Sequence, residues 1–228
     1  IVSLFSFPDF DLNSFIGPMS IDDWNKLNNK KNNVFLNRSI QSTYSPGSIF
    51  KLILASIVLE NKIITETYKV NCTGVYDFYD TQFRCWKEDG HGIISLNESI
   101  QKSCNIYYYH LMQKIDFELW SNEVRKFGFG ELTAIDLLGE KKGLVPSRKF
   151  MNKHYKHSGG WSKGHLLNLS IGQGETSVTP LQINNLISII ANSGFSYNPH
   201  INKEVEPIVN YVNYNNKARK NGTFTGTY

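Results

Sequence analysis

The strongest hydrophobic pattern in the chain covers residues 49–61, IFKLILASIVLEN. Its apolar positions surround most of a helical surface, which is typical of a helix buried in a core. A second long pattern, TPLQINNLISIIANSG, predicts a helix with Thr179 as its N-cap, Pro180 at its first position and Gly194 as its stop signal. The pattern therefore predicts two long helices, one of them inside the core.

Shorter helices are predicted between and before these two. Ser20 is a candidate N-cap for a helix over residues 21–29. Ser95, with Glu98 three residues later, has the spacing of a capping box at the start of another helix. That helix breaks near Ser103, and a further helical stretch follows in IYYYHLMQKI.

Strand signals are weaker and fall in three places. Residues 1–20 have the pattern of a strand and a loop, and residues 64–92 are aromatic and turn-rich, which predicts a β-hairpin or an irregular lobe. FGFGELTAIDL and GLVPS carry loop and strand signals. No internal repeat or linker divides the chain. The mixture of helices and strands indicates an α+β fold, with residues 1–228 forming one domain.

Composition and charge exclude several classes of protein. The 228 residues are 40% hydrophobic and 19% charged, as in an ordinary globular domain. The net charge of +4 is mild, and no basic stripe is interleaved with aromatic residues, so nucleic acid is not the expected partner. No run of about 18 apolar residues predicts a membrane span. The first residues lack a basic leader, so we expect the chain to be a piece of a longer protein.

The first candidate for chemistry is the pair Ser48 and Lys51 in YSPGSIFK. Residues three apart at the start of a helix share one face, so the lysine can reach the serine hydroxyl. Burial and the positive end of a helix both lower the pKa of a lysine, which favours its use as a base for a serine nucleophile. The alternative is an ordinary helix with Ser48 as its cap, which the pair alone does not exclude.

A second candidate is Ser103-x-Asn105 in KSCNIYYYHL, at the break between two helical stretches. Its serine is suited to relay a proton to a leaving amine, and its amide offers a donor and an acceptor to a substrate amide. The two motifs occur in the order and spacing of the Ser-x-x-Lys and Ser-x-Asn motifs of penicillin-interactive serine enzymes.

Four consecutive blocks of the chain resemble a known family. NRSIQSTYSPGSIFK, HGIISLNESIQKSCNIYYYHL, FGFGELTAIDLLGEKKGLVPS and LSIGQGETSVTPLQINNLISIIANSG resemble the transpeptidase domain of class B penicillin-binding proteins, in particular the penicillin-binding protein 2 subfamily of elongation enzymes. The resemblance implies the penicillin-binding and serine β-lactamase-like fold, an antiparallel sheet flanked by helices. It also implies a membrane anchor and a pedestal outside these residues, in a protein of the bacterial inner membrane with its catalytic domain in the periplasm.

The resemblance also implies an activity and its residues. A serine D,D-transpeptidase would cross-link peptidoglycan stem peptides during cell elongation, with Ser48 acylated, Lys51 as its base, and Ser103 and Asn105 as the second motif. β-Lactams would acylate Ser48, and the partners would be a glycan polymerase and scaffold proteins of the elongation complex. The family's third motif, Lys-Ser/Thr-Gly, is missing. Its only candidate, FTGT at residues 224–227, has phenylalanine where lysine belongs, and we expect the true motif beyond Tyr228.

Three cysteines and a histidine form the last candidate site, and two interpretations stay open for it. In a periplasmic protein Cys72 and Cys85 could form a disulfide. Alternatively, Cys72, Cys85, His91 and Cys104 form a closed Cys3His set for a structural zinc ion. The resemblance favours zinc, because relatives carry Asp at the first two positions and a carboxylate can replace a thiolate only as a ligand. No cofactor is expected for catalysis.

Two other functions compete with the transpeptidase. A serine β-lactamase or β-lactam sensor on the same fold would need a water-activating base, for which Glu175 is the candidate considered. A non-catalytic scaffold of the elongation complex would have lost the third motif. His110 is expected to pack on a helix, and His154, His157 and His165 are expected in a loop over the cleft.

Overall fold

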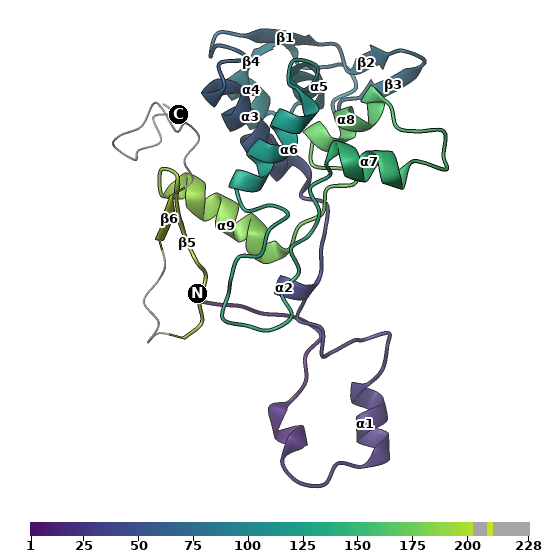
Figure 1. The fold of residues 1–228 in the computed structure, drawn as a ribbon, viewed down its shortest axis with the longest axis vertical. Helices are drawn as coiled ribbons and strands as arrows, with labels where there is room; N and C mark the ends of the chain where they lie inside the picture. The colour runs from purple at the N-terminus through teal and green to yellow at the C-terminus, as the bar shows by residue number, and fades with distance from the viewer. Residues whose placement is uncertain (203–208, 212–228) are drawn as a thin grey trace.

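The fold is described from a computed structural model of residues 1–202 and 209–211. Helices enclose the core, three pairs of short strands lie at the edges of the described body, and the first residues form a separate projection (Figure 1). The predicted α+β class is confirmed. Within the described residues, no helix has the length and apolar character needed to span a membrane.

The elements follow the chain in a simple order. The helices are α1 (Ile21–Leu27), α2 (Arg38–Gln41), α3 (Phe50–Glu60), α4 (Leu96–Gln101), α5 (Asn105–Met112), α6 (Phe117–Lys126), α7 (Arg148–His154), α8 (Lys163–Ser170) and α9 (Pro180–Ala191). Two 3-10 helices, η1 (Leu12–Phe15) and η2 (Gly47–Ile49), precede α1 and α3. The strands are β1 (Lys69–Cys72), β2 (Val75–Phe78), β3 (Thr81–Arg84), β4 (Gly92–Ser95), β5 (Phe195–Tyr197) and β6 (Val209–Tyr211).

Helix α3 is the centre of the core, as its apolar pattern predicts. Phe50, Ile53, Leu54 and Ile57 are completely buried. Helices α4, α5, α6 and α8 contact it, so most of its circumference is enclosed. A buried helix at the centre gives a rigid support to the residues at its N-terminal end, which matters because Ser48 and Lys51 lie there.

The region predicted as a hairpin or lobe contains two antiparallel strand pairs. Strands β2 and β3 form a hairpin, and β1 pairs with β4 so that Cys72 lies opposite Gly92. Cβ atoms added to Gly74 and Gly90 would fall within 2.0 Å of a backbone oxygen, and both glycines have a positive φ. The two loops therefore approach more closely than any side chain would permit, and this brings the cysteines together.

The predicted helix starts are confirmed and one predicted strand is wrong. The Ser20, Ser95 and Thr179 side chains accept hydrogen bonds from the first turns of α1, α4 and α9, and the last two form capping boxes. Residues 1–20 contain a 3-10 helix and no strand. Their alternation of apolar residues instead supplies Phe10 and Phe15 to a small aromatic cluster with Trp24 and Phe35.

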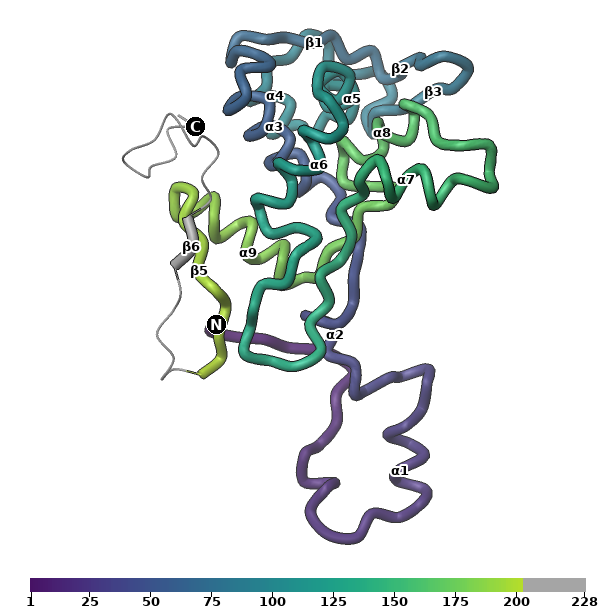
Figure 2. Tube along the Cα trace, in the orientation of Figure 1, coloured from purple at the N-terminus to yellow at the C-terminus, as the bar shows by residue number. Residues whose placement is uncertain are grey.

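That aromatic cluster belongs to a projection from the body. Residues 9–36 extend away from the body. The tube representation shows the two ends of this projection entering the body side by side near α2 (Figure 2). The connection is held by the Ser6 hydroxyl, which donates to the Leu36 carbonyl oxygen at 3.1 Å and accepts from the Arg38 N–H at 2.9 Å. The projection is separate from the residues of both candidate sites.

Candidate active site

The Ser48 hydroxyl is exposed in the turn that leads into α3, and it does not cap that helix. Helix α3 has Ile49 as its N-cap, with no side-chain capping bond. Ser48 lies inside η2, and its Oγ is 3.1 Å from Lys51 Nζ and 2.9 Å from Ser103 Oγ. The alternative interpretation of Ser48 as a helix cap is therefore wrong for this structure.

Lys51 is the polar centre of the site. Its side chain is 2% exposed on the first turn of α3. Nζ lies within hydrogen-bond distance of four oxygen atoms, and the shortest distances are 2.7 Å to the Ser103 carbonyl oxygen and 2.8 Å to Asn105 Oδ1. Burial lowers the pKa of Lys51 from 10.5 to about 8. An ammonium has only three hydrogens for these four oxygens, whereas a neutral amine has a lone pair that accepts from a serine hydroxyl.

The second motif reaches the site through a strained turn. Helix α4 ends at Gln101 and α5 begins at Asn105, and Ser103 between them has φ 49°, in the left-handed region. This conformation costs a non-glycine residue about 1–2 kcal/mol. It turns both the hydroxyl and the carbonyl group of Ser103 toward Lys51, with distances of 3.0 Å and 2.7 Å.

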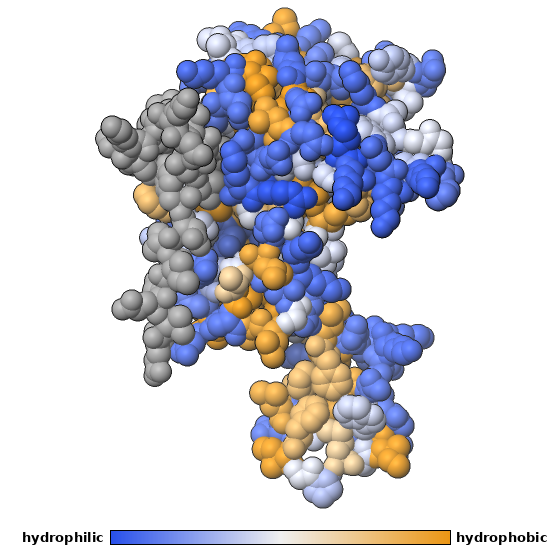
Figure 3. All heavy atoms as spheres, viewed as in Figure 1, coloured by the Kyte–Doolittle hydropathy of each residue, from blue (hydrophilic) through white to orange (hydrophobic). Residues whose placement is uncertain are grey.

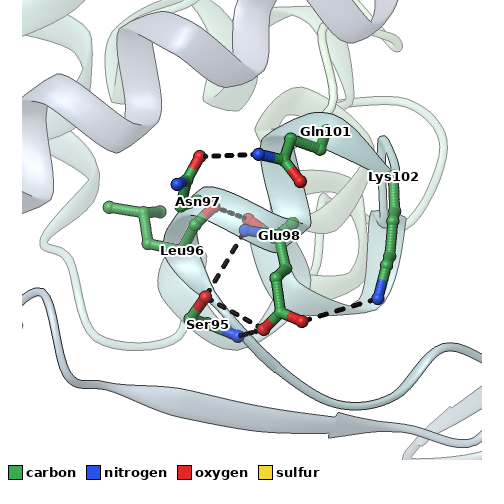
Figure 4. A network of polar contacts seen from close by, with 7 residues as sticks. Ser95, Leu96, Asn97, Glu98, Gln101 and Lys102 are labelled. Atoms are coloured by element: carbon green, nitrogen blue, oxygen red, sulfur yellow. Dashed lines mark hydrogen bonds and ion pairs between the residues drawn. The ribbon is translucent and has the colours of Figure 1, made fainter. Parts of the chain in front are cut away.

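The helix before this turn is fixed at its start and along its length. Glu98 accepts from the Ser95 backbone N–H at 2.9 Å and from the Ser95 hydroxyl at 3.0 Å, and its other oxygen lies 3.6 Å from Lys102 Nζ (Figure 4). These contacts hold down the pKa of the Glu98 carboxyl, and the bond from the Ser95 backbone N–H is the largest cause. The capping box predicted from the sequence therefore fixes helix α4, and the C-cap of that helix, Lys102, directly precedes Ser103.

Two contacts that the sequence did not indicate complete the support of the second motif. Asn105 Nδ2 donates to the Arg84 carbonyl oxygen at 3.3 Å, and the Trp86 indole N–H donates to the Lys102 carbonyl oxygen at 2.9 Å. Arg84 is the last residue of β3, and Trp86 lies just after that strand. Sequence signals describe side chains, and the acceptors here are main-chain carbonyl groups whose position only the fold sets.

The turn before Ser48 is held from the other side. Gly47 donates its backbone N–H to the Gly172 carbonyl oxygen at 2.9 Å. A Cβ on Gly172, whose φ is +70°, would meet the Gly47 carbonyl oxygen at 2.4 Å. The GQG turn at residues 172–174, which follows α8, therefore packs directly on the backbone next to Ser48.

The cysteine cluster has the dimensions of a tetrahedral metal site. His91 Nδ1 lies 3.5 Å from Cys72 Sγ and 3.6 Å from Cys85 Sγ, and the Cys85 and Cys104 sulfurs are 3.9 Å apart. A tetrahedral zinc ion with bonds of about 2.3 Å to sulfur and 2.0 Å to nitrogen would separate its ligands by about 3.8 Å and 3.5 Å respectively. All four ligand atoms lie within 4.8 Å of one another, so the donor set fits such an ion.

The oxidation state of the three cysteines bears on the alternative disulfide. All three are buried and free, so the alternative disulfide between Cys72 and Cys85 is not formed in this structure. The hydrogen bond between the Cys85 and Cys104 sulfurs lowers the pKa of Cys85 to about 4 and raises the pKa of Cys104. Because Cys104 lies between Ser103 and Asn105, one residue of the cluster is part of the same backbone segment as the second motif.

The other histidines considered in the sequence lie in helices or in the loop between two of them. His110 packs edge-on against Tyr76, with ring centroids 4.9 Å apart. Burial lowers its pKa. The loop expected for His154 and His165 is wrong, because His154 is the last residue of α7 and His165 lies in α8. The His165 Nδ1 accepts from the Ser162 N–H at 3.1 Å. His157 lies in the loop between these helices.

The two remaining candidates concern the alternative functions. Glu175 accepts a hydrogen bond from the Tyr155 hydroxyl through Oε1, and its Oε2 is buried without a partner. Within the described residues, neither oxygen is bonded to Ser48 or Lys51. Residues 224–227, the only candidate for the third motif within the chain, lie outside the described residues.

Comparison with known proteins identifies the family. The penicillin-binding protein transpeptidase domain model matches residues 1–225. Peptidoglycan D,D-transpeptidase MrdA of Acinetobacter baumannii is 32% identical over 88% of this chain and 30% of its own length, and that of Escherichia coli is 30% identical over 88% and 32%. This chain thus spans about a third of the length of the curated relatives it matches.

Solved structures give the same result for the fold. Penicillin-binding protein 2 of Helicobacter pylori, in a complex with MreC, is 35% identical, with a TM-score of 0.82 over 89% of this chain and 38% of its own. Penicillin-binding protein 2 of Pseudomonas aeruginosa, in complex with WCK 5153, is 32% identical, with a TM-score of 0.79 over 86% and 44%. The chain therefore belongs to the penicillin-binding protein transpeptidase domain family, in the class B group that contains penicillin-binding protein 2.

Proposed function

We propose that this chain is the catalytic domain of a peptidoglycan D,D-transpeptidase that works through an acyl-enzyme on Ser48. The observation that carries the proposal is the position of Lys51 Nζ, 3.1 Å from Ser48 Oγ and 3.0 Å from Ser103 Oγ. A serine nucleophile needs a base within hydrogen-bond reach, and a second hydroxyl beside that base offers a path for the proton. Here they form one hydrogen-bonded group with a buried amine at its centre.

The mechanism follows from these contacts. Neutral Lys51 takes the proton of the Ser48 hydroxyl as its oxygen attacks the carbonyl carbon between two D-alanines. The C–N bond then breaks, and the proton passes from Lys51 through the Ser103 hydroxyl to the departing amine of the terminal D-alanine. An amine from a neighbouring stem peptide attacks the ester in the second half-reaction, and Ser48 recovers its proton as the new amide forms.

Asn105 would hold Lys51 in place through this cycle. Its Oδ1 accepts from Lys51 at 2.8 Å while its Nδ2 donates to the Arg84 carbonyl oxygen. A β-lactam would acylate Ser48 in the same way and remain attached, because within the described residues no carboxylate is hydrogen-bonded to Ser48, Lys51 or Ser103.

We further infer that Cys72, Cys85, His91 and Cys104 hold a structural zinc ion. Its support is the match between their sulfur and nitrogen separations and the edges of a tetrahedron around zinc. When bound, the ion would supply no step of the reaction and would cross-link the segment after β3 to the start of α5. Cys104 would thereby fix the backbone between Ser103 and Asn105.

The setting of the whole protein is also a proposal. By similarity to the relatives named above, the domain would work in the periplasm as part of a protein anchored in the bacterial inner membrane. Its partners would be a scaffold protein, as in the complex of penicillin-binding protein 2 with MreC, and a glycan polymerase, as in a peptidoglycan synthase complex whose structure is 31% identical to this chain over 90% of its length.

The decisive experiment is intact-mass measurement after incubation with penicillin, beside a Ser48→Ala control. We expect one penicillin adduct that persists for hours and is missing in the control. Rapid loss of the adduct would point to hydrolysis and a β-lactamase. The protein used extends past Tyr228, so that it includes the expected Lys-Ser/Thr-Gly motif. If that protein is folded and forms no adduct, the non-catalytic scaffold is favoured.

A further inference from the structure

One segment of the chain carries its entire positive net charge. Residues 141–174, here called the basic segment, contain seven of the 24 Lys and Arg residues and none of the 20 acidic residues. The remainder of the chain has 17 basic and 20 acidic residues, so without this segment the chain would be acidic. The basic segment includes α7, the loop after it, α8 and the GQG turn.

Most of the charge on α7, α8 and their connecting loop is free of ion pairs. Four exposed lysines lie there: Lys149, Lys153, Lys156 and Lys163. Within residues 1–202, the ion pairs of the basic segment join Arg148 to Asp116 at 3.9 Å and to Glu118 at 3.6 Å, and none involves these lysines. The space-filling view shows a hydrophilic surface over α7 and the loop that follows it (Figure 3). The four lysines therefore remain available to an external anion.

The positions of these lysines do little for folding. Lys149 lies in the first turn of α7 and Lys163 is the first residue of α8, and neither first turn contains an acidic residue. A cation at a helix N-terminus opposes the helix dipole. Lys149 and Lys153 are four residues apart on one helical face, where like charges repel. Lys153, in the last turn, is the one member of the pair that the dipole favours.

The basic segment leads directly to the nucleophile. Helix α8 begins at Lys163 and ends at Ser170, and the next turn receives the Gly47 N–H on the Gly172 carbonyl oxygen, beside Ser48. Eight helical residues rise by about 12 Å, which an extended peptide covers with about four residues. At the other end of α8, a Cβ on Gly164 would lie 3.4 Å from the Phe83 ring, next to Arg84, whose carbonyl group holds Asn105.

We propose that the basic segment is a docking surface for the carboxylates of stem peptides along a peptidoglycan strand, adjacent to the peptide that reacts with Ser48. The inference rests on the proposed function, because it places the anionic partner beside the same nucleophile. A strand carries many such peptides, so weak contacts with several lysines add up through multivalency. Complementary charge would also speed the encounter with the polymer.

A membrane surface is the other anionic partner to consider, and the composition of the basic segment does not favour it. Interfacial binding needs apolar side chains that insert beside the basic ones. None of the large exposed hydrophobic residues of the described chain lies in residues 141–174. Met151 and Leu167, in α7 and α8, are completely buried in the core.

The test uses a triple variant, Lys149→Gln with Lys153→Gln and Lys156→Gln. A matched control removes the same charge elsewhere, at Lys30, Lys31 and Lys69, all exposed and outside the site. Binding to purified peptidoglycan sacculi is measured by co-sedimentation at low and high salt. Exposed ion pairs are individually weak, so we expect the triple variant to bind about fivefold less at low salt, and to lose most of the salt dependence. The control variant should bind like the unmodified protein.

Two parallel measurements distinguish a failure of the proposed function from a failure of the docking proposal. Acylation of Ser48 by penicillin reports on the proposed function, and it should be the same in both variants because a small β-lactam does not span the basic segment. Vesicles of phosphatidylglycerol and phosphatidylcholine report on lipid binding. Equal binding of sacculi by the triple variant and the unmodified protein would overturn the proposal. Equal losses in the triple and control variants, or stronger binding to vesicles than to sacculi, would also overturn it.

Discussion

The indole nitrogen of Trp86 lies 2.9 Å from the carbonyl oxygen of Lys102. This bond joins the segment that carries two of the clustered cysteine and histidine residues to the backbone immediately before Ser103. Trp86 is itself 64% exposed, and its ring packs edge-on against His91 with centroids 5.4 Å apart. The cluster and the second motif are therefore connected twice, through Cys104 and through Trp86.

Trp86→Phe should slow acylation of Ser48 by penicillin, because it removes the N–H donor and keeps an aromatic ring against His91. The bond holds the strained turn at Ser103, and a hydrogen bond contributes about 1 kcal/mol net. Its loss lowers the population of the reactive turn, so we expect the acylation rate to fall roughly three- to tenfold. The rate is measured with a fluorescent penicillin. Trp24→Phe, in the projecting residues 9–36, is the matched control and should leave the rate unchanged.

Acylation should depend on pH through Lys51. Only the neutral amine can accept the Ser48 proton, and burial holds the pKa of Lys51 at about 8. The rate should therefore rise as pH increases, about tenfold per unit below pH 8, and level off above it. A rate that stays constant between about pH 6 and pH 9 would show that Lys51 is not the base.

Removal of metal should weaken both the fold and the reaction. A chelator that strips zinc would leave three buried thiols and an imidazole without their common ligand, and the free energy of zinc binding would be lost from folding. We expect one zinc per chain by mass spectrometry under non-denaturing conditions, and a fall of several degrees in the melting temperature after chelation.

A substitution within the cluster gives an independent check on metal removal. His91→Ala should reduce zinc content and lower the acylation rate, whereas His110→Ala, at a histidine that packs on Tyr76, should retain the metal. Full zinc content in His91→Ala would contradict the assigned ligand set.

Gly172→Ala should displace the nucleophile turn. The new Cβ would meet the Gly47 carbonyl oxygen at 2.4 Å and the Phe50 Cβ at 2.6 Å, so backbone next to Ser48 has to move. We expect a destabilisation of about 3 kcal/mol and a large loss of acylation, measured by denaturant unfolding and by the fluorescent penicillin.

Gly128→Ala is the control for Gly172→Ala, because it separates the effect of the steric clash from the effect of the positive φ. Gly128 has a similar φ, +85°, but a Cβ at this position would have no atom within 4 Å, so alanine there should cost only the left-handed strain of about 1 kcal/mol. Its acylation rate should stay close to that of the unmodified protein. Equal effects of the two substitutions would mean that contact with Gly47 is unimportant.

The sequence by itself determined the local structure and which side chains are candidates for the chemistry. Periodic apolar residues predicted α3 and α9, and Ser95 with Glu98 predicted the start of α4, because helix burial and capping depend on residues close in sequence. The spacing of Ser48 and Lys51 was also local. The strand expected in residues 1–20 failed for the same reason, since an alternating pattern cannot distinguish a strand from aromatic residues that meet across a loop.

Only the tertiary structure decided how these parts meet. Ser103 comes within 2.9 Å of Ser48 although 55 residues separate them, and the four cluster residues converge because Gly74 and Gly90 let two loops touch. The carbonyl groups of Arg84 and Lys102 became supports of the second motif through folding alone. The sequence specifies which side-chain groups are present, whereas the position of a main-chain acceptor depends on packing between distant segments.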